Sequence, residues 1–491
     1  MKSKKIWLLG IFLLGIILRC LFIVRREIQY DDAFSMLLSQ QSYPAIIKGT
    51  ASDTMPPLYY FLLHAWNSLG MQIWWDRVLS VLLSLAGIWV LYRIVLLLAD
   101  ERAALMAAFF AAISPIQIYH AQDIRMYALL QLTQLAYTFF FIKLFLQDGL
   151  NENKGWVWGG LIVSGALSMY THNLAVFFIL IPDIILLFYR RWQLLKKLIL
   201  AQVAIAVIVL PWLIYVPGQI SKIQQAFWTP RPGILEIVQA IMMFTTTLPL
   251  PQNMLPLGLS LSITIIIFVG FMLFQRQYKG SSYPALIILG IGLPLELFIT
   301  SYVMRPVFVP RGFVVSSMFL YALIGLVLSK GIRKPAGVII TGAFLVCVGI
   351  ALPYQYQFNQ FPRSPFKETT QYLEANYSSD TLIVHDNKLS LFPSKIYDAN
   401  LPQTFLADEP GSHNDTLAYD SQVALNLIPE QDISTSAGNY TSVDFVVFTQ
   451  AIEEYKAAGL ENHPNISWLE DHYDLKHIEQ IGDLGIYEFS K

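Results

Sequence analysis

The chain has 491 residues, of which 55% are hydrophobic and 14% are charged, and its mean hydropathy is +0.50. This composition excludes a wholly soluble protein. The formal net charge of −1 indicates neither a nucleic-acid partner nor a polybasic membrane anchor. Cys20 and Cys347 both fall in apolar runs, so the sequence predicts no disulfide framework and no zinc site.

Apolar residues recur in runs of about 20, which is the length of helix that crosses a hydrocarbon core roughly 30 Å thick. The first run follows a basic start, as in a signal peptide. Its length, its Arg19 and the lack of a small-x-small cleavage site favour a retained span. The sequence predicts about eleven transmembrane helices, near 6–24, 77–98, 103–119, 126–146, 156–170, 173–189, 198–216, 255–274, 283–302, 312–329 and 335–352.

The connections between these runs alternate between basic and basic-poor, as the positive-inside rule requires of cytoplasmic and outer loops. The basic group begins with the lysines of the N-terminus and includes the cluster at 190–197. The sequence therefore predicts a cytoplasmic N-terminus, in the inner (plasma) membrane if the cell is taken to be bacterial. The loops expected outside are 25–76, 120–125, 217–254 and 303–311.

The chain becomes polar after Leu352 and has no further run of spanning length. A helical spacing of apolar residues over 366–377 precedes short β-type runs at 381–384 and 443–448, which favours an α/β fold over an all-β fold. We therefore predict two domains. Residues 1–352 form the transmembrane domain, with the active site on its first outer loop 25–76, and residues 353–491 form an extracytoplasmic soluble α/β domain.

Two adjacent carboxylates, Asp31 and Asp32, open an amphipathic helix directly after the first run. One interpretation is structural, because acidic residues cap and stabilise helix N-termini. The other is functional, because paired carboxylates at a membrane boundary are costly unless they act as a base or hold a metal. The two interpretations are compatible.

Two further outer segments carry polar residues. Pro56-Pro57 begins an aromatic helix with Tyr59 and His64, which could also be an interfacial aromatic belt. A second segment at the start of the fourth run holds Asp123, Arg125 and Tyr127, whose charges could also be interface charges that snorkel.

In this order, the motifs resemble those of the C-type membrane glycosyltransferases of family 39. That group contains the protein O-mannosyltransferases and bacterial relatives such as the lipid A aminoarabinose transferases. The resemblance covers roughly residues 5–330 and rests on Asp31-Asp32, Pro56-Pro57-Leu58-Tyr59-Tyr60, Asp123-x-Arg125-x-Tyr127, Tyr170-Thr171-His172 and Pro310-Arg311.

The resemblance implies a C-type glycosyltransferase fold and transfer of a sugar from a polyprenyl phosphate to an acceptor outside the membrane. It places Asp31 at the position of the catalytic aspartate and Asp32 at that of the acid that follows it, which is most often Glu in relatives. A second departure is Met55, which stands where relatives often carry Lys or His.

Chemistry then suggests roles for the remaining residues. Asp31 is expected to take the proton of the acceptor hydroxyl in an inverting displacement, although a retaining reaction with Asp31 as nucleophile stays open. Arg125 and Arg311 are expected to bind the phosphate, because guanidinium groups stay charged and bind phosphate oxygens bidentately. The other expected substrate-binding residues are Arg305, a weaker third cation, and Asp123, Tyr127, His172, Tyr59 and His64. The alternatives are that Arg311 anchors the end of a helix and that His172 and His64 are structural.

Three questions stay open at this stage. A divalent metal ion on the acidic pair with a histidine is conceivable, although no spacing rule supports it. The acceptor is a protein, a lipid or a glycan. The alternative function is a multi-span lipid or glycan transporter or flippase, and it is disfavoured because the outer acids and arginines gather at one membrane face instead of at span midpoints.

Overall fold

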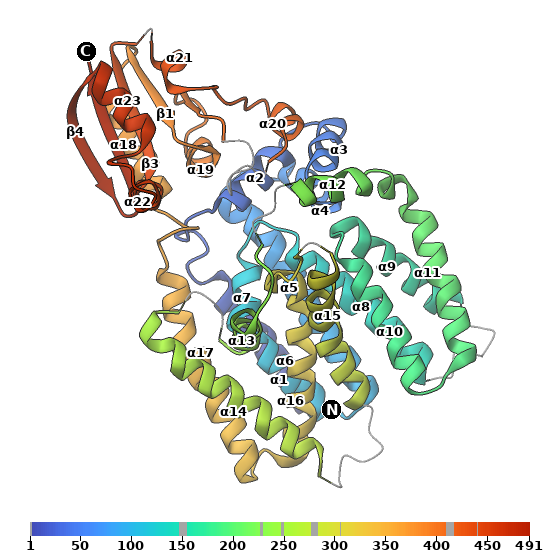
Figure 1. The fold of residues 1–491 in the computed structure, drawn as a ribbon. Helices are drawn as coiled ribbons and strands as arrows, with labels where there is room; N and C mark the ends of the chain where they lie inside the picture. The colour runs from blue at the N-terminus through green and yellow to red at the C-terminus, as the bar shows by residue number, and fades with distance from the viewer. Residues whose placement is uncertain are drawn as a thin grey trace. The chain divides into compact units, whose positions relative to one another are not determined.

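The structure is a computed structural model that describes residues 2–146, 155–225, 229–246, 250–275, 283–304, 306–408, 417–438 and 440–491. The chain forms two compact units (Figure 1). The first, called here the membrane unit, contains Met1–Val24, Thr54–Gln224 and Thr229–Gln357. The second, called the α/β unit, joins Arg25–Asp53 to Phe358–Lys491.

The membrane unit is helical in all its described elements, and a helix lies at each apolar run that the sequence predicts to span. Seven of the described helices are long and apolar enough to cross a membrane, or eight if the bent pair α6 and α7 counts as one span. The number of eleven spans therefore stays a prediction. The elements are α1 (Lys2–Cys20), α4 (Leu58–Asn67), α5 (Ile73–Leu98), α6 (Glu101–Ile113), α7 (Pro115–Ala121), α8 (Tyr127–Leu146), α9 (Gly155–Thr171), α10 (Ala175–Phe188), α11 (Trp192–Leu213), α12 (Val216–Gln225), α13 (Ile234–Met243), η1 (Gln252–Met254), α14 (Leu255–Leu273), α15 (Tyr283–Val303), η3 (Pro310–Phe313), α16 (Val314–Gly331) and α17 (Pro335–Gln357).

The run at 103–119, expected as one helix, bends by 61° between α6 and α7. The bend occurs at Ser114, whose backbone is extended, directly before Pro115. A proline has no N–H and clashes with the preceding turn, so the carbonyls at the end of α6 lose their intrahelical donors. The buried Arg19 of α1 replaces them, because Nη1 donates to the Ala112 carbonyl at 2.8 Å and Nη2 to the Ala111 carbonyl at 3.3 Å.

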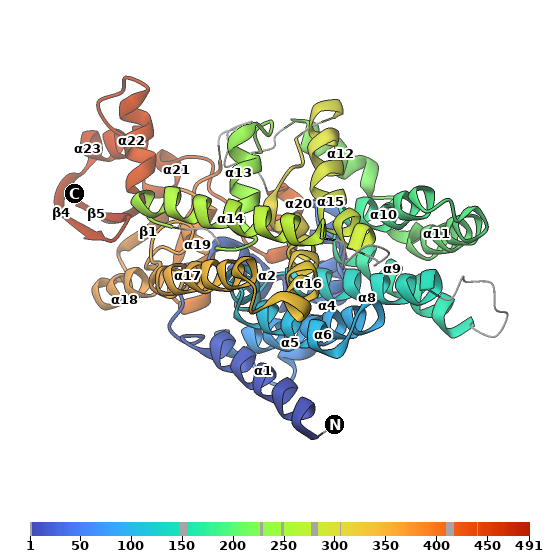
Figure 2. The same ribbon diagram turned by 90° about the horizontal axis from the view of Figure 1, so that it is seen from below.

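Helix α16 is buried on nearly all sides and packs against α6, which lies beside it (Figure 2). A Cβ atom on Gly325 would lie 2.5 Å from the Ala103 carbonyl oxygen and 2.7 Å from the Ala107 backbone nitrogen. Helices in lipid associate through small residues that let their backbones approach closely. The alanine-rich face of α6 together with Gly325 therefore sets this central contact.

The α/β unit contains one sheet of five strands in the order β2-β1-β3-β5-β4. β1 runs parallel to β2 and β3, whereas β5 is antiparallel to β3 and β4. The predicted α/β class is confirmed, and the helix expected before the first strand is α18. The elements are α2 (Tyr30–Ser39), α3 (Tyr43–Ser52), α18 (Phe366–Asn376), β1 (Thr381–His385), α19 (Lys388–Tyr397), β2 (Gln403–Phe405), α20 (Tyr419–Leu425), α21 (Ile433–Ala437), β3 (Ser442–Phe448), α22 (Thr449–Ala457), α23 (Pro464–His472), β4 (Asp474–Ile481) and β5 (Leu484–Ser490).

Helix α2, which carries the acidic pair, packs on α19 of the α/β unit. The rings of Tyr30 and Phe392 lie 5.3 Å apart between centroids. The Tyr397 hydroxyl donates to Glu27 Oε2 at 2.7 Å, just before α2 begins. The segment 25–53 is thus held by residues from the far end of the sequence, which the local sequence pattern does not predict.

Helix α3 packs on α20 in the same unit. Ser421 Oγ donates to the Gly49 carbonyl at 2.8 Å. A Cβ atom on Gly49 would lie 2.9 Å from Leu38 Cδ1 and 3.3 Å from Ala424 Cβ, so this position needs a glycine for close packing. Both helices of the loop therefore have partners within the α/β unit.

Candidate active site

The two carboxylates at the start of α2 have different surroundings. Asp32 is fully buried, and its Oδ2 accepts a hydrogen bond from the backbone N–H of Gln29 at 3.3 Å. An acid at this position of the first turn satisfies a backbone donor that the helix leaves unpaired. The structural interpretation of the pair therefore applies to Asp32.

Asp31 is only partly buried, and it lies in the first turn of α2, where the helix dipole stabilises a carboxylate. Its backbone carbonyl accepts from Ser35 Oγ at 2.9 Å. Between the two acids, Asp31 is thus the one with an accessible surface, as a group that takes a proton from a substrate requires.

In the membrane unit, the turn between α7 and α8 carries Asp123 and Arg125, both buried. Gln122 Nε2 donates to the carbonyls of Arg19 and Leu21, both at 2.9 Å, and so fixes the turn to the end of α1. The imidazole of His120 extends from the last turn of α7, and its Nδ1 lies 3.0 Å from Asp123 Oδ2. The bend before Pro115 sets the position of this turn, because α7 leaves the direction of α6 by 61°.

Arg125 reaches the aromatic helix α4. Its Nη1 donates to the Tyr60 hydroxyl at 3.3 Å, and the ring of Tyr60 contacts that of Tyr59 edge to face at 5.9 Å. Both tyrosines are fully buried. Pro57 precedes α4 directly, so the double proline ends one segment and starts the helix that presents these rings.

Arg311 approaches the same region from η3. Its guanidinium carbon lies 6.0 Å from the centroid of the Tyr127 ring, at the outer limit of a cation–π contact. Arg311 is half-buried and follows Pro310, whose ring suits the first position of a helical turn.

His172 lies in the turn between α9 and α10. Its Nδ1 accepts a hydrogen bond from the backbone N–H of Leu174 at 3.1 Å. Burial first, then the charges of Arg311 and Arg125, lower the pKa of His172 to about 3. The ring is therefore neutral at physiological pH, and the positive charge of this region comes from the two arginines.

The structure thus brings Asp123, Arg125, Tyr127, His172 and Arg311 into one region of the membrane unit, hereafter the arginine cluster. Tyr59 borders it through Tyr60. His64 lies on α4 and is half-buried. Arg305 lies outside the described residues.

Sequence reasoning passed over two residues of this region. In the sequence, Tyr60 is part of an aromatic run, and only its contact with Arg125 distinguishes it. His120 stands three residues before Asp123, a spacing that could have suggested a pair. Among the described residues, no group of three or more His, Cys, Asp or Glu side chains is placed to hold a metal ion.

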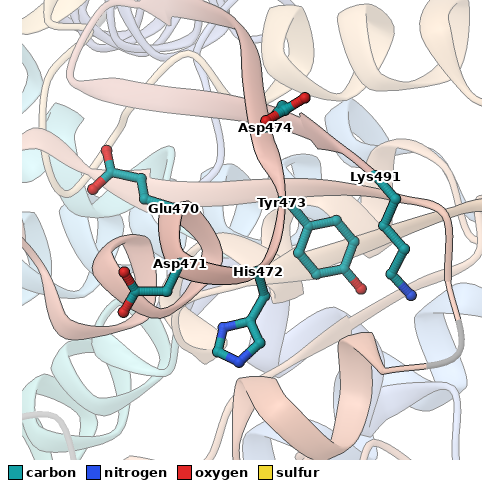
Figure 3. Close-up of a pocket in the computed structure, with 6 residues that line it drawn as sticks. All are labelled: Glu470, Asp471, His472, Tyr473, Asp474 and Lys491. Carbon is teal, nitrogen blue, oxygen red and sulfur yellow. The ribbon is translucent and has the colours of Figure 1, made fainter.

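The α/β unit has an open pocket at the start of β4, lined by the residues labelled in Figure 3, Glu470, Asp471, His472, Tyr473, Asp474 and Lys491. Several of its polar groups already have partners within the protein. His472 Nδ1 lies 2.8 Å from the Trp468 carbonyl, and Lys491 Nζ donates to the Gly438 carbonyl at 3.2 Å. None of the residues expected from the sequence to act on a substrate lines this pocket.

Comparison with known families agrees with the motifs. Residues 54–215 match the family model described as dolichyl-phosphate-mannose-protein mannosyltransferase. The matched segment contains the α4 helix, the α7–α8 turn and His172, whereas Asp31 and Arg311 lie outside it. No curated protein sequence is similar enough to the chain to count as a match.

Solved structures resemble the chain over nearly its whole length. The apo structure of ArnT from Cupriavidus metallidurans superposes with a TM-score of 0.67 at 12% identity, covering 99% of this chain and 98% of ArnT. The structure of that ArnT bound to undecaprenyl phosphate gives 0.67 at 13% identity, with 98% of each chain covered. The archaeal oligosaccharyltransferase AglB from Archaeoglobus fulgidus, in complex with an inhibitory peptide and a dolichol-phosphate, gives 0.56 at 12% identity, covering 99% of this chain and 74% of AglB.

At these low identities, the superpositions establish likeness of fold alone. The C-type fold expected from the sequence, and the resemblance to the family 39 type of membrane glycosyltransferase, are both confirmed. The chain is accordingly a multi-span membrane protein with a small C-terminal sheet.

Proposed function

We propose that the chain is a membrane glycosyltransferase that moves a sugar from a polyprenyl-phosphate donor to a hydroxyl group of an acceptor on the extracytoplasmic face. The observation that carries the proposal is the arginine cluster, in which burial and then the charges of Arg311 and Arg125 lower the pKa of His172. Two guanidinium groups held in one region, beside a histidine that stays neutral, favour a ligand with a multiply charged anionic group.

A polyprenyl phosphate has the required chemistry. Its headgroup gains negative charge when the bond to the sugar breaks, and fixed guanidinium groups stabilise that charge without reorganising. The ArnT and AglB structures contain undecaprenyl phosphate and dolichol-phosphate respectively, which supports a lipid phosphate as the ligand here. Arg125 donates to the Tyr60 hydroxyl and Arg311 lies beside the Tyr127 ring, and these contacts favour a preorganised pair of guanidinium groups.

Asp31 is proposed as the base. In a single displacement, the carboxylate of Asp31 takes the proton from the acceptor hydroxyl as its oxygen bonds to the anomeric carbon. The bond from that carbon to the phosphate oxygen breaks, its electron pair stays on the phosphate, and the configuration inverts. Asp32 acts as a positioning residue, because it caps the helix that carries Asp31.

The test replaces Asp31 by Asn in the full chain and measures transfer from radiolabelled polyprenyl-phosphate sugars in membranes. We expect transfer to fall at least about 100-fold, since general-base catalysis contributes roughly that much or more. Sorting the label into protein, lipid and glycan fractions identifies the acceptor class, and the anomer of the product distinguishes inversion from retention. Asp474→Asn, at an exposed carboxylate of the same unit, is the matched control.

Normal transfer by a correctly inserted Asp31→Asn variant would overturn the proposed base. The phosphate site is tested separately by Arg311→Leu, which should raise the donor KM and weaken inhibition by sugar-free polyprenyl phosphate. An Arg311→Leu enzyme with an unchanged inhibition constant would contradict the role of the cluster.

A lipid transporter is the second candidate, and one observation favours it. Asp183 of α10 and Glu296 of α15 are half-buried carboxylates within apolar helices, and Gln202 Nε2 donates to Asp183 Oδ2 at 2.7 Å. Acids at such positions commonly serve transport. Lipid movement in proteoliposomes that Asp183→Asn abolishes, with no sugar transfer by the unaltered protein, would favour this function.

The orientation also belongs to the proposal. The basic connections favour a cytoplasmic N-terminus in the inner (plasma) membrane and an extracytoplasmic α/β unit. With Cys20 and Cys347 replaced, a cysteine introduced at the exposed Asp474 should react with a membrane-impermeant thiol reagent in intact cells. Labelling only after the membrane is opened would reverse the assigned orientation.

A further inference from the structure

We propose that His120 binds a hydroxyl group of the donor sugar, and that Asp123 is the positioning residue that fixes its imidazole for this contact. The inference rests on the proposed function, because it takes the arginine cluster as the site of the donor phosphate. It assigns a contact with the donor sugar to a histidine that the sequence motifs do not single out.

The pairing with Asp123 sets the hydrogen-bonding character of the ring. Nδ1 lies 3.0 Å from Asp123 Oδ2, and both side chains are buried, His120 with 5% and Asp123 with 1% of its surface exposed. An ionised carboxylate only accepts hydrogen bonds, so this partner assigns the hydrogen to Nδ1. In the neutral ring, Nε2 then carries a lone pair and acts as an acceptor.

Nε2 of His120 is buried and has no hydrogen-bond partner among the described residues. Buried polar atoms in folded proteins nearly always have a partner, and an exception calls for an explanation. A ligand group that donates a hydrogen supplies the partner that the protein leaves out. The fixed ring meets this ligand without losing further rotational freedom, which is the advantage of preorganisation.

The position of the ring favours the sugar over the other parts of the substrate. The imidazole contacts the Tyr127 ring edge to face at 5.0 Å, and Arg311 lies against the same tyrosine ring at 6.0 Å. The anomeric carbon is bonded to a phosphate oxygen, so a group beside the phosphate cations meets the sugar. Phosphate oxygens themselves call for a donor, whereas sugar hydroxyls supply the hydrogen that Nε2 needs.

The test compares two variants of the full chain in membranes. His120→Asn keeps an amide nitrogen that can reach Asp123 but removes the acceptor at Nε2. His120→Gln carries its amide group about as far out as Nε2 and restores an acceptor there. Transfer is measured with polyprenyl-phosphate sugars that lack one hydroxyl at a time, and binding of the sugar-bearing and sugar-free lipids is measured on the same preparations.

We expect one deoxy donor to lower kcat/KM of the unaltered enzyme roughly tenfold, which is the loss expected from a single missing hydrogen bond. His120→Asn should lose a similar factor with the complete donor and no longer distinguish that deoxy donor from it, and His120→Gln should recover part of the difference. Binding of sugar-free polyprenyl phosphate should be unchanged in both variants, whereas Arg311→Leu should weaken it.

His120→Asn that keeps the full discrimination between donors would overturn the proposal. So would an equal loss of affinity for the sugar-free lipid, which would make His120 a phosphate ligand or a structural residue. An unaltered protein that transfers no sugar from any donor contradicts the proposed function instead, and the two lipid-binding measurements then decide the role of His120 independently.

Discussion

Arg19 Nη1 donates a hydrogen bond to the carbonyl oxygen of Ala112 at 2.8 Å, and Arg19 Nε donates to Ser84 Oγ at 3.0 Å. A buried guanidinium of the first helix thus replaces the backbone donors that Pro115 removes from the end of α6. The carbonyls of Arg19 and Leu21 in turn accept from Gln122 in the turn before Arg125. The end of α1 therefore holds both the break between α6 and α7 and the turn between α7 and α8 that carries Arg125.

Replacing Arg19 by Met should destabilise the membrane unit and weaken the arginine cluster together. The substitution leaves the Ala111 and Ala112 carbonyls buried without the donors seen here, which should cost about 2–4 kcal/mol of unfolding free energy. Thermal unfolding in detergent and the donor KM measure the two effects. Arg93→Met, at an exposed arginine of α5, should change neither. A stable Arg19→Met protein with a normal KM would contradict this support role.

The two acids of α2 should differ in what their replacement costs. Asp32→Ala removes the acceptor for the Gln29 N–H and should cost about 0.5–2 kcal/mol. Asp32→Asn keeps an oxygen there and should preserve both the helix and most of the transfer activity. Hydrogen exchange of residues 29–39 together with transfer rates checks this. If Asp32→Asn abolishes transfer while the helix stays protected, Asp32 takes part in the chemistry itself.

Asp444 of β3 should make the α/β unit less stable as the pH rises. Burial, and then the charge of Glu488, raise the pKa of Asp444 to about 7. The two residues lie directly opposite each other on β3 and β5. The folded state therefore keeps a proton that the unfolded chain releases near pH 4, so stability falls between pH 4 and pH 7.

Asp444→Asn should remove this loss and stabilise the unit at pH 8 by up to about 4 kcal/mol, with little gain at pH 4. Urea unfolding of the full chain at each pH, followed by a digestion pulse at neutral pH, measures the difference. Asp474→Asn, at an exposed carboxylate, is the control. Equal gains at pH 4 and pH 8 would mean that the aspartate is ionised throughout.

The sequence predicts local features of this fold well. Apolar length locates the helices, and short runs of β-branched and other apolar residues locate β1 and β3, because both patterns reflect nearby burial. Pro115 is a local indication of the bend at Ser114, but the continuous apolar composition of 103–119 predicts a single helix there. The packing of α2 on α19 had no such sign, since the contact between Tyr30 and Phe392 joins segments that no local pattern relates.

The residues of the candidate site also differ in how well the sequence predicts them. Its charged residues stand out in sequence, because arginines and acids at membrane boundaries are unusual. The residues that contact them do not stand out. Tyr60 resembles the other aromatic residues of α4, and in the sequence Arg19 serves only to disfavour a cleaved signal peptide. Asp183 and Glu296 were likewise passed over, because each is a single acid in a long apolar run.

The contact between Glu27 and Tyr397 also determines when the segment that leads into the acidic helix can reach its packing partner during biosynthesis. The two residues are 370 positions apart. A ribosome adding about 5–20 residues per second needs on the order of tens of seconds to cover that distance. The segment that bears Asp31 is thus translated among the first, yet its packing partner arrives only when most of the protein has been made. A nascent chain that stops before Tyr397 carries the acid without the surface that orders it.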